Sequence, residues 1–138
     1  ALFDNNNDSI EFIFDNKVGK VTCMARKGQI TRVFVNLISN AVQAMDDISG
    51  EIISITLSYQ DDRNIRIDVE DSGSGVSDEN LHKLFTPNFT TKTSGTGLGL
   101  AICKNIITEN HGTIRYEKSA KYGGANFIIT LPFHKENG

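Results

Sequence analysis

At 138 residues, with 38% hydrophobic and 22% charged residues, the chain has the size and composition of one soluble globular domain. Its net charge of -3 gives no support for electrostatic binding to nucleic acid or to an anionic membrane. No apolar run approaches the roughly 20 residues of a membrane helix. The two cysteines, Cys23 and Cys103, lack metal-ligand spacing, which favours reduced thiols in a cytosolic setting.

The first nine residues are polar and rich in asparagine, so we expect a flexible lead-in over residues 1–9, one domain over residues 10–133 and a tail over residues 134–138. Alternating apolar residues predict a first strand from Ile10 to Phe14 and a second around Val21 and Cys23.

A strong helical pattern begins at Gln29, and its apolar positions are Ile30, Val33, Phe34, Leu37, Ile38, Ala41, Val42 and Met45. Asn36 and Asn40 lie one turn apart at the edge of this face. An amide there offers a carbonyl oxygen to Mg²⁺ and an NH₂ group to a phosphate. The alternative is that these asparagines are only tolerated on an exposed helix surface.

Two alternating runs between residues 53 and 69 predict an antiparallel hairpin. Asp71 continues the parity of the apolar side chains, so we expect its carboxylate to point inward. A buried carboxylate needs a partner, and Gly73 and Gly75 leave room for a flat ligand such as adenine, whose amino group could donate to Asp71. The alternative is an aspartate that opens a turn by accepting from its own backbone.

Ser77 predicts the N-cap of a short helix that reaches Leu84. Further along, Gly95, Gly97 and Gly99 alternate directly before an apolar-periodic stretch. A flexible backbone that leads into a helix N-terminus favours an anion such as phosphate. Other polar groups of the segment are Lys92 and the hydroxyls of Thr90, Thr91, Thr93, Ser94 and Thr96.

Two common phosphate-binding loops do not fit this segment. It lacks the third glycine of a dinucleotide-binding fingerprint and the Gly-Lys-Ser/Thr sequence of a P-loop. A mobile surface loop without a ligand remains the alternative.

The apolar face of the next helix is predicted from Leu98, Ala101, Ile102 and Ile106. This helix ends near His111, and Gly112 suits the cap position. Two last alternating runs flank a turn at residues 121–124 and predict a final hairpin. The whole pattern predicts a two-layer α+β sandwich, with a mixed, mostly antiparallel sheet covered on one face by three helices.

Four motifs resemble those of the ATP-binding catalytic domain of bacterial sensor histidine kinases, in the superfamily that includes DNA gyrase and the heat-shock chaperone and mismatch-repair ATPases. Residues 36–41 look like the N box, 71–75 the first glycine box, 85–89 the F box and 95–100 the second glycine box. The resemblance covers residues 10–131. It implies the Bergerat ATP-binding fold, with ATP and Mg²⁺ as ligands.

The resemblance also implies a role for each matching residue. Asn40 would coordinate Mg²⁺, Asp71 would read the adenine amine, and Asn36 and Lys92 would act on the phosphates as the catalytic pair. Residues 86–96 would form a short ATP lid. The implied ATP-binding residues are Asn36, Asn40, Asp71, Gly73, Gly75, Val76, Thr90, Thr91, Lys92, Gly95, Thr96, Gly97, Leu98, Gly99 and Leu100.

The sequence departs from relatives that hydrolyse ATP. They place a glutamate base one turn before the magnesium asparagine, where this chain has Asn36, an amide that cannot act as a base. Gln43 stands where many histidine kinases carry a lysine, which resembles the nitrogen-regulation type. None of His82, His111 and His134 lies in an acidic helical sequence, so we expect the phosphoacceptor histidine on another domain.

The sequence leaves three functions open, in this order. The first is the catalytic part of a histidine kinase, which gives the γ-phosphate of ATP to a histidine on the dimerisation and phosphoacceptor domain of the same parent protein, with a response regulator downstream. The second is an ATPase module that drives conformational change, and the third is a non-catalytic nucleotide-binding module. We expect a cytoplasmic domain, and the sequence leaves open whether the inner membrane anchors the parent protein.

Overall fold

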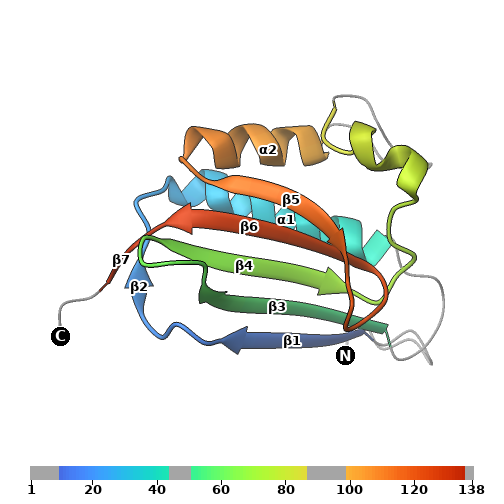
Figure 1. The fold of residues 1–138 in the computed structure, drawn as a ribbon, viewed down its shortest axis with the longest axis horizontal. Helices are drawn as coiled ribbons and strands as arrows, with labels where there is room; N and C mark the ends of the chain where they lie inside the picture. The colour runs from blue at the N-terminus through green and yellow to red at the C-terminus, as the bar shows by residue number, and fades with distance from the viewer. Residues whose placement is uncertain (1–9, 44–50, 87–98, 136–138) are drawn as a thin grey trace.

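The computed structural model describes residues 10–43, 51–86 and 99–135. In these ranges a five-stranded mixed sheet lies beneath two α-helices and a 3-10 helix, which confirms the predicted two-layer sandwich (Figure 1). The elements in chain order are β1 (Ile10–Asn16), β2 (Val21–Thr22), α1 (Lys27–Gln43), β3 (Glu51–Tyr59), β4 (Asn64–Asp71), η1 (Asp78–Lys83), α2 (Gly99–Glu109), β5 (Thr113–Lys118), β6 (Ala125–Pro132) and β7 (His134–Lys135). None of the described helices could span a membrane.

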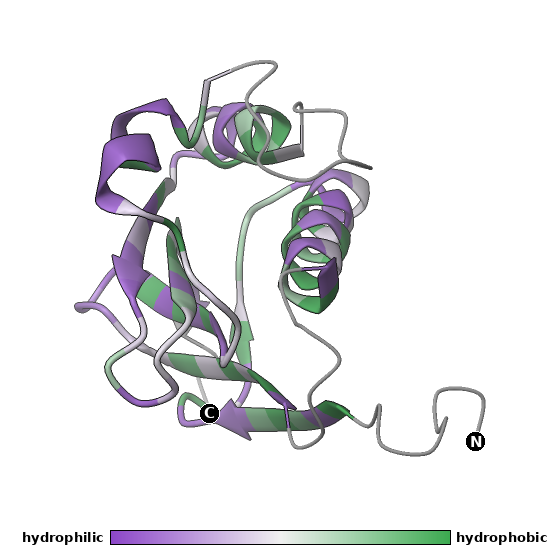
Figure 2. Ribbon diagram, turned by 90° about the vertical axis from the view of Figure 1, so that its right-hand side faces the viewer, coloured by the Kyte–Doolittle hydropathy of each residue, from purple (hydrophilic) through white to green (hydrophobic). Residues whose placement is uncertain are grey.

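The strands of the large sheet lie in the order β1-β3-β4-β6-β5. The predicted hairpin is confirmed, since β3 pairs antiparallel with β4 in a register that sets Ile55 opposite Val69. β6 is antiparallel to both β4 and β5. β1 runs parallel to β3 because the chain crosses over through α1 between them. The stripes along the strands in Figure 2 follow the period-two alternation of hydropathy.

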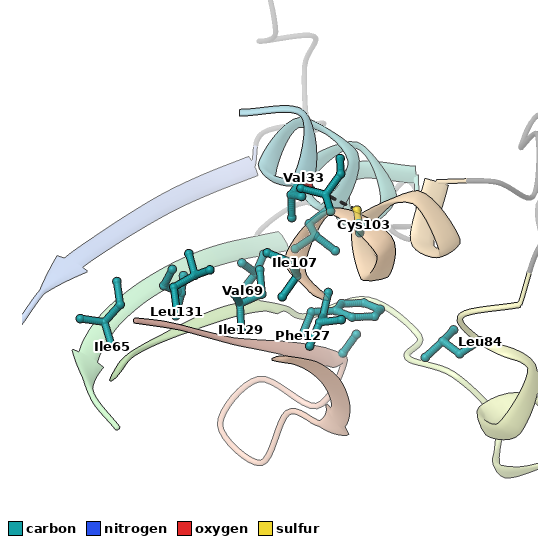
Figure 3. Packing of buried hydrophobic residues seen from close by; sticks show 14 of the residues in the cluster. Val33, Ile65, Val69, Leu84, Cys103, Ile107, Phe127, Ile129 and Leu131 are labelled. Carbon is teal, nitrogen blue, oxygen red and sulfur yellow. Dashed lines mark hydrogen bonds between the residues drawn. The ribbon is translucent and has the colours of Figure 1, made fainter. Parts of the chain in front are cut away.

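The core lies between the sheet and the two α-helices. Figure 3 shows Val33 of α1 and Cys103 of α2 facing each other above Val69, Phe127 and the neighbouring side chains of the sheet. The thiol of Cys103 donates a hydrogen bond to the carbonyl oxygen of Val33 at 3.7 Å. Both residues are fully buried, so this apolar seam fixes α2 against α1.

The second α-helix buries two of its predicted residues, Ala101 and Ile106, while Leu98 lies outside the described residues. Its buried residues are Ala101, Cys103, Ile106 and Ile107, whereas Ile102 is half-buried. The left-handed residue after the helix is His111, with φ 66°, rather than Gly112. A Cβ on Gly112 would collide with the carbonyl oxygen of Thr130. The glycine therefore allows β6 to pass close to the end of the helix.

Two further local expectations differ from the structure. Ser77 precedes η1 but makes no side-chain cap hydrogen bond; instead its hydroxyl accepts from the side chain of Asn80 at 3.1 Å. The second predicted strand is only two residues long, and Cys23 lies beyond it. This strand pairs antiparallel with His134 and Lys135, the first residues of the predicted tail.

The sheet face that points away from the helices carries a polar network around Asp68. Its carboxylate accepts hydrogen bonds from the guanidinium of Arg66 at 2.8 and 3.0 Å and from the amide of Asn126 at 2.9 Å. Burial raises the pKa of Asp68, but the hydrogen bonds from Arg66 and Asn126 outweigh it, so the pKa lies below its usual value. The ionised carboxylate therefore stabilises the fold.

We expect Asp68→Asn to lower the urea midpoint of unfolding at about pH 7 and to matter much less at about pH 3, where the unfolded-state carboxyl is protonated. A carboxyl whose pKa is depressed by folding stabilises above its unfolded-state pKa, and this contribution disappears as the pH falls through the folded-state pKa. Asp62→Asn, at an exposed position, is the matched control. If Asp68→Asn lowered the urea midpoint equally at both pH values, the charge of the carboxylate would have no role in stability.

Candidate functional site

Several of the predicted site residues lie at one end of the molecule. The end of β4, the turn between β5 and β6, η1 and the first residue of α2 all lie toward the right-hand side of Figure 1, with the C-terminal half of α1 beside them. The N box, the first glycine box and the start of the second long helix are thereby brought together. They come from segments far apart in the sequence.

Asn36 lies beside the first residue of α2. It is half-buried, and a Cβ built on Gly99 would lie 4.0 Å from its Cγ atom. Burial raises the pKa of the Cys103 thiol, and this outweighs a hydrogen bond with Asn36 and the charge of Arg32, which both lower it. Asn36 therefore lies close to both the Cys103 thiol and the start of α2.

Gly99 begins an α-helix of 11 residues. The first N–H groups of a helix have no partner within it, and together with the helix dipole they favour an anion. The next residue, Leu100, is half-buried and packs against the core, which fixes the first turn in place. The described part of the second glycine box can thus receive a phosphate beside Asn36.

Asn40 lies one helical turn after Asn36 on α1 and is half-buried. Among the described residues, no three histidine, cysteine or acidic side chains gather as a metal site. Mg²⁺ keeps several waters and binds substrate phosphates, so it needs few protein ligands, and the amide of Asn40 offers one oxygen of the kind that this ion prefers.

Asp71 is buried at the end of β4, with 3% of its surface exposed, on the side that packs against the helices. Its Oδ1 atom accepts hydrogen bonds from the backbone N–H of Gly73 at 2.9 Å and of Ala125 at 3.1 Å. Asp71 is buried, as its parity predicts, and it also opens a turn by accepting from its own backbone, which was the alternative to an adenine contact. The bond from Ala125 also ties Asp71 to the start of β6.

The loop after β4 takes its shape from the first glycine box. Gly75 has φ +74°, a conformation that favours glycine. The backbone N–H of Val76 donates to the hydroxyl of Tyr116 on β5 at 2.9 Å, and the side chain of Val76 packs against the core.

Sequence reasoning missed Gly124, Ala125 and Tyr116, which all contact this loop. A Cβ on Gly124 would collide with the side chain and the carbonyl oxygen of Asp71. The available signal was the Gly123-Gly124 pair, which predicted only a turn.

The remaining predicted ligands of the phosphates lie outside the described residues: Thr90, Thr91, Lys92, Gly95, Thr96, Gly97 and Leu98. Their roles stay predictions, as does the lid over residues 86–96.

Residues 25–135 match the family of histidine kinase-, DNA gyrase B- and HSP90-like ATPases. The chain is 37% identical over 137 residues to the sensor protein FixL of Bradyrhizobium diazoefficiens. That alignment covers 99% of this chain but 27% of FixL, so the chain spans about a quarter of this relative's length.

Among solved structures, the nucleotide-free catalytic domain of the histidine kinase ThkA is 35% identical, with a TM-score of 0.78. The match covers 89% of this chain and 80% of that domain. Histidine kinase ThkA in complex with the response regulator TrrA is also similar, with 32% identity, a TM-score of 0.74 and coverage of 94% of this chain and 36% of that one.

These similarities confirm the resemblance that rested on the four motifs. ATP is the nucleotide of the matched family. The family match covers most of the sequence, and the structural match covers 80% of the ThkA catalytic domain. The chain therefore belongs to the histidine kinase-, DNA gyrase B- and HSP90-like ATPase family, as a catalytic domain of the sensor histidine kinase type.

Proposed function

We propose that this domain binds Mg·ATP and passes the γ-phosphoryl group to a histidine on a separate domain of its parent protein. The bond between the γ-phosphorus and the β–γ bridging oxygen breaks, a bond from the γ-phosphorus to an imidazole nitrogen forms, and ADP leaves. The domain contributes position and charge neutralisation, which carry most of the catalysis in phosphoryl transfer.

The observation that carries this proposal is the placement of Asn36 beside Gly99 at the start of α2. An amide there can donate a hydrogen bond to a phosphate oxygen, but it cannot remove a proton from water. The site therefore favours transfer to a supplied nucleophile over hydrolysis. We propose that the ammonium group of Lys92 also contacts these phosphates, through a charge-assisted hydrogen bond.

At the other end of the site, we assign Asp71 to the adenine amino group. The buried carboxylate already has one oxygen fixed by two backbone N–H groups, which sets its orientation. A carboxylate oriented in this way accepts from an amine without reorganising when the base binds. Gly73 and Gly75 keep the backbone free of side chains where the base approaches.

We assign Mg²⁺ to the amide oxygen of Asn40. The donor set fits this ion, since Mg²⁺ prefers oxygen ligands and shares its shell with phosphates and water. When bound, the ion neutralises charge on the phosphates. Asn40 would hold the ion beside α1, one helical turn from the amide of Asn36.

The chain's own histidines support an external acceptor. His82 lies in the 3-10 helix η1, His111 in the turn after α2 and His134 in β7, so none of the three lies on an α-helix. We propose that the acceptor lies on a dimerisation and phosphoacceptor domain of the parent protein, which then phosphorylates a response regulator. The similar kinase solved with a response regulator supports this order, and the two free cysteines fit a cytoplasmic location.

The adenine assignment is tested by Asp71→Asn. This change keeps an oxygen for the two backbone N–H groups but presents an NH₂ group where the base amine would donate. We expect the dissociation constant for ATP, measured by isothermal titration calorimetry, to rise about 10- to 100-fold, the worth of a hydrogen bond to a charged group. Asp68→Asn, on the opposite face of the same strand, is the control and should leave ATP affinity unchanged. Unchanged affinity for Asp71→Asn would remove Asp71 from adenine recognition.

Phosphotransfer is tested by incubating the chain and labelled ATP with the separately supplied acceptor domain of its parent protein. We expect label on the acceptor only when this chain is present, and Asn40→Ala should raise the Mg²⁺ concentration needed for half-maximal transfer at least about tenfold. Asn105→Ala, at an exposed position on α2, should behave as wild type. Steady release of free phosphate without acceptor would instead indicate an ATPase, and ATP binding without transfer would indicate a non-catalytic module.

A further inference from the structure

The loop from Ser72 to Val76 is anchored at both ends by other strands. On one side, Ser72 donates its backbone N–H to the carbonyl oxygen of Ile52 at 3.1 Å and its hydroxyl to Glu51 at 2.7 Å. On the other side, the N–H of Val76 donates to the hydroxyl of Tyr116 at 2.9 Å. Between these anchors lie the glycines that we assign to the adenine base.

We propose that Tyr116 is a positioning residue for adenine recognition. Its hydroxyl fixes the position of the loop backbone relative to the carboxylate of Asp71. The inference rests on the proposed binding of ATP and names a residue that none of the four motifs contains. Tyr116 would not touch the reacting atoms; it acts through the backbone at Gly75 and Val76. Its hydroxyl accepts the only hydrogen bond recorded between the described loop backbone and a side chain of β5.

The ring of Tyr116 is half-buried and packs against an aromatic neighbour, and such packing supports a positioning residue. Tyr116 lies directly opposite Phe127 in the pairing of β5 with β6. Their ring centroids are 5.5 Å apart in an edge-on arrangement, and Phe127 in turn meets the edge of Phe85 at 6.3 Å. Because the ring is packed on this side, the hydroxyl stays at a fixed place beside the loop.

The fit between Tyr116 and Gly75 is close. A Cβ built on Gly75 would lie 3.2 Å from the tyrosine hydroxyl and 3.6 Å from the backbone of Gly124. The loop is therefore confined between β5 and the β5–β6 turn, and the first residue of β6, Ala125, donates its N–H to Asp71. One hairpin thus positions both the acid and the glycine backbone that would face the base.

The test compares Tyr116→Phe with Tyr59→Phe. The first change removes only the hydroxyl that accepts from Val76. The second removes a similar hydroxyl, which donates to the carbonyl oxygen of Val18 at 3.1 Å, near the opposite end of the sheet. Each variant thus loses a hydrogen bond between a tyrosine hydroxyl and the backbone, and thermal unfolding verifies that both remain folded.

The experiment measures the dissociation constant of Mg·ATP by calorimetry and that of inorganic triphosphate by competition against ATP. Tyr116→Phe should weaken ATP binding about five- to tenfold, the worth of one ordinary hydrogen bond. Inorganic triphosphate has no base, so its affinity should stay at the wild-type value, and the ratio of the two affinities should fall. Hydrogen exchange of the Val76 amide in the nucleotide-free chain should become faster. Tyr59→Phe should change none of these quantities.

Three results would overturn the inference. They are wild-type ATP affinity in Tyr116→Phe, an equal loss of ATP affinity in Tyr59→Phe, and an equal loss of affinity for ATP and for inorganic triphosphate. A wild-type chain that binds no ATP would overturn the proposed function first and this inference with it, and calorimetry on the wild type alone shows that result.

Discussion

The carboxylate of Asp71 is buried at the end of β4, and a carboxylate in such a place needs hydrogen bonds to offset its loss of water. Two backbone N–H groups meet one of its oxygens, from Gly73 beside it and from Ala125 across the sheet. Gly124 has no room for a Cβ at this point. The carboxylate therefore joins the loop after β4 to the first residue of β6, and it helps to position the glycines that follow.

The end of the site near Asn36 is fixed by a different kind of contact. Cys103 and Val33 are fully buried where α2 packs on α1, and this seam places Asn36 beside Gly99. Here close apolar packing decides where the polar groups meet. Hydrogen bonds thus fix the end of the site at Asp71, and helix packing fixes the end at Asn36.

Local patterns predicted much of this architecture. Period-two alternation gave the hairpin and the inward parity of Asp71, and the 3.6-residue period gave the long helix with Asn36 and Asn40 at its edge. Features that depend on distant segments were not predicted. The sequence pattern near Gly112 indicated a cap, but only the approach of β6 explains the glycine. The donor from Ala125, like the pairing of β2 with β7, joins residues remote in sequence, which no local periodicity records.

The separation of Asp71 from its second donor has a consequence for biosynthesis. Ala125 follows Asp71 by 54 residues, so at roughly 5–20 residues per second the ribosome finishes β4 several seconds before it makes the strand that supplies this donor. During that interval water solvates the carboxylate at no cost. The nascent chain can therefore pair β3 with β4 early, while the end of the sheet that carries Asp71 matures only once the last hairpin has been translated.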